Sequence, residues 1–476
     1  MKLLLGFCIA LVVLHFPVQG DHHGDHGAHG KNHGDHSHEQ GHKHEHGDHG
    51  AHGKGHGGHS HEQGHKHEHG DHGAHGKGHG GHSHEKGHKH EHGDHRHEKH
   101  VNGSLRIYLQ NGGFAFEMYK HMTAQPDLQS KNVFFSPLSL SLALGALSVG
   151  AQGETHRQLF EGLGFNETDI TPEEVNDAFH DILMNLNQKK DAELSVGSAL
   201  FLDDNFKPRP EFLEALKRFY HSEGFTTDFT ESAEARNAVN NYVKEKTHGK
   251  ITELVDSVEP STLMILISYV YFKGKWDIPF DPANTEDSVF HVNETHDVPV
   301  KMMTESNSFY IYHDEKHSTC VLQLLYNESM SMMLILPENG LEALEKVFDG
   351  KLVSKWRRSL RKMPYKVSIP KFSIKTSYSL KEVIAEMGIT DIFSQTANFK
   401  GISDDPLSVS KVLQKATLDV DEEGSTATAA TSIHLIRTSG FIPTNTLRFD
   451  RPFVVIIANR DTRSILFMGK IVNPTK

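Results

Sequence analysis

The sequence predicts an α+β domain over residues 105–476 of a 476-residue chain, preceded by two segments of other kinds. Composition divides the chain sharply: residues 1–20 are apolar, 21–104 are dominated by His and Gly, and the remainder has the mixture of a globular protein. Within 105–476, segments with helical periodicity alternate with short apolar runs typical of strands. This length is enough to bury a sizeable core, in one large domain or in two tight lobes.

Residues 1–20 have the features of a secretory signal peptide. Lys2 supplies the positive start, Leu3 to Val13 the apolar run, and Val18-Gln-Gly20 the small residues expected before cleavage. We therefore expect a secreted, extracellular protein. The apolar run is short for a membrane helix, so we expect no membrane span. Export agrees with four glycosylation sequons, which begin at Asn102, Asn166, Asn293 and Asn327.

Export also decides which cysteines the mature chain keeps. Removal of the signal takes Cys8 away and leaves Cys320 as the only cysteine of the mature chain. No intramolecular disulfide can form, so core burial alone must hold the globular part together.

Residues 21–104 form a repeat arm with a period of 23 residues, in which 64–86 repeat 41–63 with Lys86 in place of Gln63. Between His22 and His100 lie 29 of the 40 histidines, and no Leu, Ile, Val, Phe, Tyr or Trp. Nothing there can offset the ordering entropy of the chain, so we expect a disordered arm. The H-E-x-x-H patterns in it lack the stable helix that zinc-protease chemistry requires.

Flexible histidine clusters can still bind divalent metal, and neutral imidazole suits zinc and copper. No cofactor is required by this interpretation; zinc or copper on the arm is the hypothesis. Its candidate ligands are His22, His23, His42, His44, His46, His65, His67, His69, His88, His90 and His92.

The arm also has a pH-dependent charge. From Asp21 to His100 it carries 13 Asp or Glu and 9 Lys or Arg, about −4 in all while the histidines are neutral. Histidine titrates near pH 6.5, so acidification turns the arm cationic and predicts binding to a polyanion at acid pH. The whole chain carries a net charge of −13 with neutral histidines, which argues against nucleic acid as a partner.

Several elements of 105–476 can be placed by pattern. Ala115–His121, Leu138–Val149 and Glu211–Tyr220 are expected helices, and Thr171 followed by Pro172 is a helix start. The strand candidates are Leu263–Phe272, Met330–Leu336, Tyr365–Ile374, Val454–Ile457 and Ser464–Val472. The sequence contains none of the loop motifs of nucleophile-elbow hydrolases, phosphate-binding enzymes or dinucleotide-binding enzymes, so we expect no enzyme.

Four stretches together resemble one family, the serpins. They are Asn132-Val-Phe-Phe-Ser-Pro-Leu-Ser-Leu140, Phe272-Lys-Gly-Lys-Trp276, Leu447-Arg-Phe-Asp-Arg-Pro-Phe-Val-Val455 and Phe467-Met-Gly-Lys-Ile-Val-Asn-Pro474. They occur in family order and cover essentially all of 105–476, with the plasma antitrypsin group the most similar. The resemblance does not extend to the arm.

The resemblance implies the serpin fold, with about nine helices, three β-sheets and an exposed reactive loop at about 422–446. It also implies suicide inhibition, in which a serine protease cleaves the loop, stays covalently attached, and is trapped as the loop inserts into a sheet. We expect a monomer whose partner is a trypsin-like serine protease. The alternative is a non-inhibitory carrier of metal or a small ligand on the same scaffold.

The hinge of the loop favours inhibition. The family pattern maps it onto Glu422, Gly424, Ser425, Ala427, Ala429 and Ala430. Small side chains such as these can enter a sheet without overpacking. By resemblance, Glu422 also pairs with Lys371 at the top of the sheet.

The bait bond is assigned to Arg437–Thr438, the only bond after a basic residue in the exposed loop. Arginine matches the acidic primary pocket of trypsin-like proteases. Family spacing from Glu422 would instead place Thr438 before the cut, and counting back from the C-terminal motif would give Phe441. The segment 172–181 is acidic, so no heparin site is expected on that helix.

Overall fold

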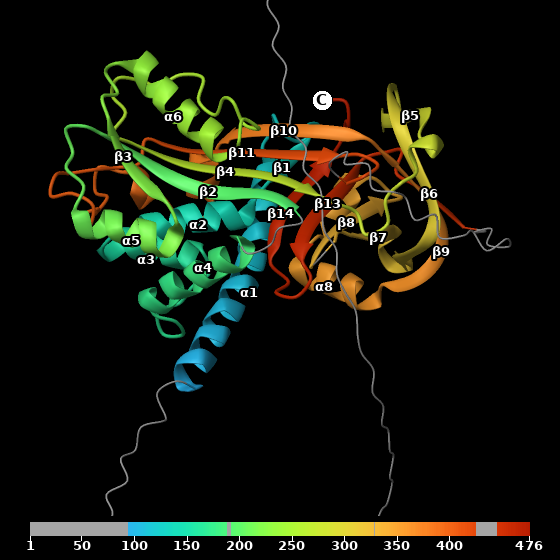
Figure 1. The fold of residues 1–476 in the computed structure, drawn as a ribbon, viewed down its shortest axis with the longest axis horizontal. Coiled ribbons are helices and arrows are strands. Elements are labelled where there is room, and N and C mark those ends of the chain that lie inside the picture. Colours follow the sequence, from blue (N-terminus) through green and yellow to red (C-terminus); the bar gives the residue numbers. More distant parts are fainter. Residues whose placement is uncertain (1–93, 188–191, 328, 425–444) are drawn as a thin grey trace, which may run out of the picture. The chain divides into compact units, whose positions relative to one another are not determined.

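The computed structural model describes residues 94–187, 192–327, 329–424 and 445–476 (Figure 1). The predicted signal peptide, the candidate metal-binding histidines, the bait bond and the hinge beyond Gly424 lie outside the described residues. The first helix begins at Asp94, inside the segment that the sequence assigned to the arm. Among the residues described, none of the helices combines the length and apolar character that a membrane crossing requires.

Nine α-helices occur in the described residues, the number that the resemblance implied. They are α1 Asp94–Ala124, α2 Pro137–Ser148, α3 Gly153–Gly162, α4 Pro172–Asn187, α5 Pro210–Tyr220, α6 Ser232–Lys246, α7 Leu341–Glu345, α8 Gly350–Ser359 and α9 Lys381–Glu386. Fourteen strands accompany them. They are β1 Val133–Phe135, β2 Ala192–Asp203, β3 Glu223–Thr227, β4 Met264–Gly274, β5 Glu286–Asn293, β6 His296–Asp314, β7 Thr319–Leu325, β8 Met330–Pro337, β9 Arg361–Pro370, β10 Phe372–Ser379, β11 Lys411–Val420, β12 Thr446–Arg448, β13 Phe453–Asn459 and β14 Ile465–Ile471.

One sheet has five strands in the order β10-β11-β4-β2-β3, and helices cover both of its faces (Figure 1). On one face α6 packs Val239 and Val243 into an apolar cluster with Phe201 and Ile265 of the sheet. On the other face lies α2, whose residues are all buried. Both faces of the sheet are therefore core, which explains why β4 is a nearly continuous apolar run instead of an alternating one.

The remaining strands form one nine-stranded network in place of the two further sheets that we expected. The reason is the length of β6, which has 19 residues. Its first part pairs with β5 and its last part with β7, so a single strand joins what would otherwise be two sheets.

Most elements expected from pattern are present. Thr171 caps α4 by accepting from the Glu174 amide at 3.2 Å, while the Glu174 carboxylate accepts from the Thr171 amide at 3.1 Å, which is a capping box. One prediction was wrong: Tyr365–Ile374 is not one strand but parts of β9 and β10, which belong to different sheets. Pro370 has no amide proton to continue a ladder, and the Lys371 amide donates to Lys301 O where the chain changes sheets.

The buried carboxylate of Asp314 joins α8 to the end of β6. It accepts from Trp356 Nε1 at 2.7 Å and Lys355 Nζ at 3.3 Å, and His317 Nδ1 lies 2.9 Å away. Burial alone would raise the pKa of Asp314, but these hydrogen bonds lower it to about 2. The carboxylate is therefore charged throughout the physiological range.

We expect Asp314→Asn to lower the urea midpoint of unfolding at pH 7, because hydrogen bonds to a charged acceptor contribute about 1.5–3 kcal/mol. The pKa is depressed in the folded state, so this contribution is complete above the ordinary value of 3.8 and is lost as pH falls toward about 2. The gap between wild type and variant should therefore shrink between those values. The exposed Asp256→Asn is the matched control, and an equal midpoint for both variants would contradict the assignment.

Cys320 is free and buried, with 5% of its surface exposed. Burial raises the pKa of the thiol to about 12, and the charge of Glu338 acts in the same direction. Because the thiolate is the nucleophile, we expect iodoacetamide at pH 8 to label the folded protein on the order of 100-fold more slowly than the urea-unfolded chain. Mass spectrometry of timed samples measures both rates, and similar rates would contradict the burial.

Candidate functional site

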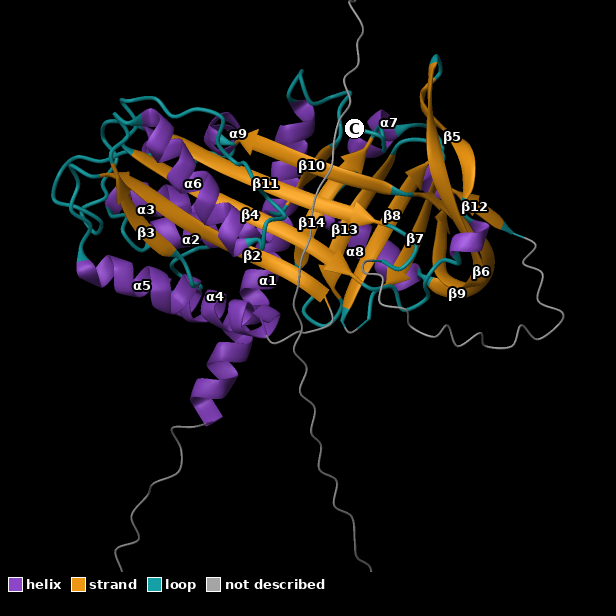
Figure 2. Ribbon diagram, turned by 45° about the horizontal axis from the view of Figure 1, so that its top comes forward, coloured by secondary structure: helices purple, strands orange, loops and turns teal. Residues whose placement is uncertain are grey.

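Two interior strands of the five-stranded sheet, β4 and β11, run parallel and directly beside each other (Figure 2). Parallel strands end at the same edge of a sheet, so the chain that leaves β11 starts beside the end of β4. A segment folding back from there would run antiparallel to both strands, and antiparallel ladders are slightly more stable than parallel ones. We call this pair the β4–β11 seam; a further strand could enter it only if β4 and β11 separated.

The residues that follow β11 are held against the end of β4. The Phe280 amide donates to Glu422 O at 2.8 Å, the Trp276 amide to Glu423 O at 3.2 Å, and Trp276 Nε1 to Asp421 O at 2.9 Å. Gly424 has φ of +83°, and a Cβ there would lie 2.4 Å from the Trp276 nitrogen. Any other residue would clash with the backbone, which is the steric reason for glycine at this hinge position.

The side chain of Glu422 is the most buried acidic group at this edge, with 8% of the residue exposed. Lys371 Nζ lies 2.7 Å from its Oε2, and Thr285 Oγ1 donates to its Oε1 at 2.8 Å. Burial opposes ionisation, but the hydrogen bonds from Lys371 and Thr285 outweigh it and lower the pKa of Glu422. The ionised side chain therefore links β11 to the segment between β9 and β10 and to residues beyond β4.

We expect Glu422→Lys to increase polymer formation on mild heating, because the change puts two cations together where an ion pair held the end of the seam closed. Native gels of heated samples give the monomer fraction. Glu423→Lys is the matched control, since it makes the same charge change at an exposed neighbouring residue. If both variants kept the wild-type monomer fraction, Glu422 would have no role in closing the seam.

A buried polar cluster crosses the middle of the seam, where Gln414 of β11 faces Ser268 of β4. Gln414 Nε2 donates to Ser136 O at 2.9 Å, to Ser139 Oγ at 3.1 Å and to Ser268 Oγ at 3.3 Å. Ser268 Oγ also donates to Ser139 Oγ at 2.8 Å. These contacts tie both strands to the start of α2, and a strand entering the seam must replace them because unpartnered buried polar groups are costly.

Sequence reasoning did not single out Gln414 or Ser268. Ser136 and Ser139 appeared only as letters of a family motif, and nothing local marks a glutamine in a strand as part of a shared cluster. A useful signal was available all the same: Gln414 is the polar member of the alternating set Val412, Ala416 and Leu418, which form one buried face of β11. Buried polar residues of this kind are normally hydrogen-bonded, so a partner could have been expected.

A second group that sequence reasoning missed is cationic and belongs to α8 and the start of β9. Within 351–362 there is no Asp or Glu, and the basic residues are Lys351, Lys355, Arg357, Arg358, Arg361 and Lys362. All but the half-buried Arg357 are exposed. Burial and the nearby charges of Arg463 and Arg358 lower the pKa of Arg357. Among the residues described, only Lys355 of this α8–β9 cationic cluster has an acidic partner.

Three of the four sequons can be examined, and their asparagines are exposed: Asn166, Asn293 and Asn327. In the first two, the side-chain oxygen accepts from the backbone and the hydroxyl of the sequon threonine, in a turn on the surface. The side chain of Asn102 lies outside the described residues.

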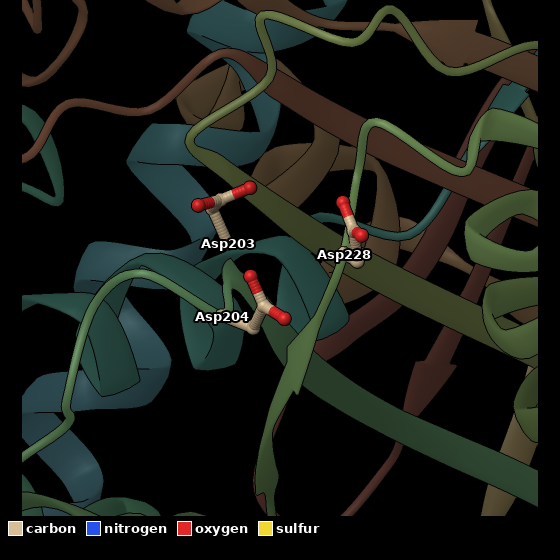
Figure 3. Close-up of side chains that lie close together, drawn as sticks. All are labelled: Asp203, Asp204 and Asp228. Carbon is tan, nitrogen blue, oxygen red and sulfur yellow. The ribbon is translucent and has the colours of Figure 1, made fainter.

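One acidic group has the spacing of a metal site. Asp203, Asp204 and Asp228 have carboxylate oxygens within 4.8 Å of one another, at the ends of β2 and β3 (Figure 3). Two of the three carboxylates already accept hydrogen bonds within their own loops. Asp203 accepts from Asn205, and Asp228 accepts from the Thr230 amide. We therefore assign no metal to this group.

A parallel strand pair with the following chain anchored at its end is the arrangement expected of proteins that work by strand insertion. The family model described as serpin (serine protease inhibitor) matches residues 109–474. The chain therefore belongs to the serpin family.

Individual relatives differ in what their names describe. Serine protease inhibitor A3L of Rattus norvegicus is 43% identical over 390 residues, covering 79% of this chain and 92% of its own. Hibernation-specific plasma protein HP-55 of Tamias sibiricus is 38% identical over 376 residues, covering 78% and 90%. The structure of human thyroxine-binding globulin matches with a TM-score of 0.75 and 37% identity, covering 79% of this chain and all of that one. One relative is thus named as an inhibitor and another as a binding protein.

Proposed function

We propose that this serpin is a secreted inhibitor of trypsin-like serine proteases that acts once, as a suicide substrate. The observation that supports the proposal is the β4–β11 seam, a parallel pair whose end lies beside the start of the chain after Gly424, so that separation of the two strands would let that chain pair antiparallel with both. The residues that would enter first, from Ser425 to Ala430, are all Ser, Thr or Ala. Small side chains suit a strand that is to be buried on both faces.

The chemistry follows from the bond that is attacked. The protease serine hydroxyl adds to the Arg437 carbonyl, the bond to Thr438 breaks, and the amine of Thr438 leaves with a proton as a new N-terminus. Arg437 stays attached to the protease as an ester. If the segment between Gly424 and Arg437 enters the seam before water hydrolyses that ester, the protease is carried with it and trapped. If insertion is slower than hydrolysis, the chain is only a substrate.

Incubation with trypsin followed by a denaturing gel tests the proposal. A band at the summed mass of both proteins, resistant to boiling in detergent, is the expected result. Clean cleavage of the chain without that band would favour the carrier alternative, which the name of thyroxine-binding globulin keeps open. Size exclusion of the untreated protein tests the expected monomer.

Secretion is part of the same proposal. It is supported by the signal-like residues 1–20, by the exposed sequons and by the relative named as a plasma protein. Removal of N-linked glycans by a glycosidase should lower the mass of the exported protein. Peptides containing Asn166 and Asn293 should carry the modification.

A second candidate function, polyanion binding, is favoured by the α8–β9 cationic cluster. Arginine forms strong charge-assisted pairs with sulfate groups, and five of the six basic side chains are exposed. The arm would add a pH-dependent component as its histidines become protonated. The cluster would thus bind a sulfated glycan at neutral pH, and the arm would strengthen binding at acid pH.

Heparin-column retention at fixed salt separates the two contributions. Deleting residues 21–100 should reduce retention mainly at pH 6.0, whereas replacing Arg357, Arg358 and Arg361 by Ser should reduce it at pH 7.4 as well. Replacing the exposed Lys207, Lys375 and Lys400 by Ser removes the same charge from other elements and is the control. If both triple variants were retained equally, the α8–β9 cationic cluster would have no specific role in polyanion binding. An immobilised-zinc column with the same arm deletion tests metal binding by the arm.

A further inference from the structure

The turn between β7 and β8 carries the glycosylation sequon that begins at Asn327 and is completed by Ser329. Asn327 is exposed, and its side-chain amide makes no hydrogen bond among the described residues. Nothing in the described part of the chain therefore competes for that amide. An N-linked glycan attached there would be a bulky, hydrophilic group on the surface.

One peptide group connects this sequon to the residues that follow β11. The Asn327 amide donates to Lys275 O at 2.8 Å, and the Trp276 amide donates to Glu423 O at 3.2 Å. Lys275 O and the Trp276 nitrogen belong to the same planar peptide unit and point in opposite directions. The Asn327 nitrogen and Glu423 O are therefore no more than about 9 Å apart.

Further contacts reinforce this connection. The rings of Trp276 and Tyr326 are stacked with their centroids 4.3 Å apart, and Trp276 Nε1 donates to Asp421 O at 2.9 Å. The Asp277 amide also donates to Leu325 O at 2.9 Å. The β7–β8 turn and the end of β11 are thus held to opposite sides of the same segment, the one that follows β4.

This packing places the sequon beside the edge of the sheet at which a strand would enter the β4–β11 seam. β4 ends at Gly274 and β11 ends at Val420, so both strands of the seam end here. A strand from another molecule would have to approach this edge through solvent, beside a glycan on Asn327. The chain's own loop would not, because it begins at Gly424, which already packs against the backbone of Trp276.

We propose that an N-linked glycan on Asn327 obstructs the entry of strands from other molecules into the β4–β11 seam and leaves insertion of the chain's own loop unhindered. This role rests on the proposed function, because it requires that a strand can enter the seam. The glycan would separate inhibition from self-association, since association through the seam requires the loop of one molecule to enter the sheet of another.

A labelled synthetic peptide with the sequence of residues 425–437 is the probe, because it is the inserting segment detached from the chain. The exported full-length protein and its variants are incubated with the peptide, and uptake is timed on native gels. Asn327→Gln should take up the peptide about fivefold faster than the wild type, since a modest excluded-volume barrier has been removed. Asn293→Gln removes the sequon in the exposed β5–β6 turn and should match the wild type. All three proteins should form the covalent complex with trypsin at the same yield.

Two further samples separate loss of the glycan from loss of the asparagine. Ser329→Thr keeps the sequon and the hydroxyl that accepts from Asn459 Nδ2, so it should take up the peptide at the wild-type rate. Trimming the wild-type glycans to their first sugar with an endoglycosidase should reproduce the rate of Asn327→Gln.

Equal uptake by the wild type, Asn327→Gln and Asn293→Gln would overturn the role of the glycan. Mass spectrometry that found Asn327 unmodified in the exported protein would overturn it as well. Uptake by none of the proteins would contradict strand entry into the seam, and with it the proposed function.

Discussion

Replacing Ser425 with arginine is expected to convert the protein from an inhibitor of trypsin into a substrate. The segment that starts at Ser425 must be buried between β4 and β11, whose side chains are mostly buried on both faces of the sheet. An arginine there would be a buried charge without a partner, which is costly enough to stop insertion. The ester to the protease would then be hydrolysed before the loop moves. On a denaturing gel the covalent band should disappear and the cleaved chain should accumulate.

Ser425→Ala is the control for this experiment, because it changes the same residue without adding charge or volume. It should form the covalent complex at the wild-type yield. A complex formed at wild-type yield by Ser425→Arg would show that the hinge is not where the family pattern puts it. Cleavage at the same bond in all three proteins establishes that the loop remains accessible.

Arg437→Ala is expected to abolish inhibition of trypsin-like proteases. Their primary pocket binds a cation through an acidic group, and alanine leaves that group unpaired in the complex. The second-order rate constant of trypsin inhibition should fall by at least about 1,000-fold, whereas Arg437→Lys should keep most of it. Mass spectrometry of the wild-type complex should find a released C-terminal fragment that begins at Thr438.

Two other N-termini of the released fragment would assign cleavage to a different bond. A fragment that begins at Ser439 would place the cut after Thr438, the result of the common family spacing. One that begins at Ile442 would place it after Phe441 and point to chymotrypsin-like proteases instead. In either case Arg437→Ala should leave inhibition of the true target nearly unchanged, so kinetics and mass spectrometry check each other.

Much of the fold could be predicted from local pattern. The capping box at Thr171, the buried helix after Ser136 and the apolar strand at Met264 each depend on residues close together in the sequence. The boundary between β9 and β10 could not be predicted in this way, because both segments alternate apolar and polar residues as one strand would, and the change of sheet depends on distant partners. The joining of two expected sheets by β6 likewise depends on which strands lie beside it.

At the candidate site, the resemblance identified Glu422, Gly424 and Lys371 by position, and the structure supplies what each one contacts. The clash that excludes every residue but glycine at 424 involves the backbone of Gly274 and Trp276, far away in the chain. The α8–β9 cationic cluster lies away from α4, the acidic helix at which the family pattern would place a heparin site. Its charges are visible in the sequence, but their exposure is not.

The sequence by itself determined the signal-like start, the histidine repeats, the family motifs, the small-residue hinge and the single basic bait candidate, because each is a property of neighbouring residues. Only the tertiary structure decided that β4 and β11 are parallel neighbours and that Gln414 joins Ser268 across them. These features require segments more than a hundred residues apart to meet. Pattern along the chain reports which residues are buried, whereas the partners they meet are set by how the whole core packs.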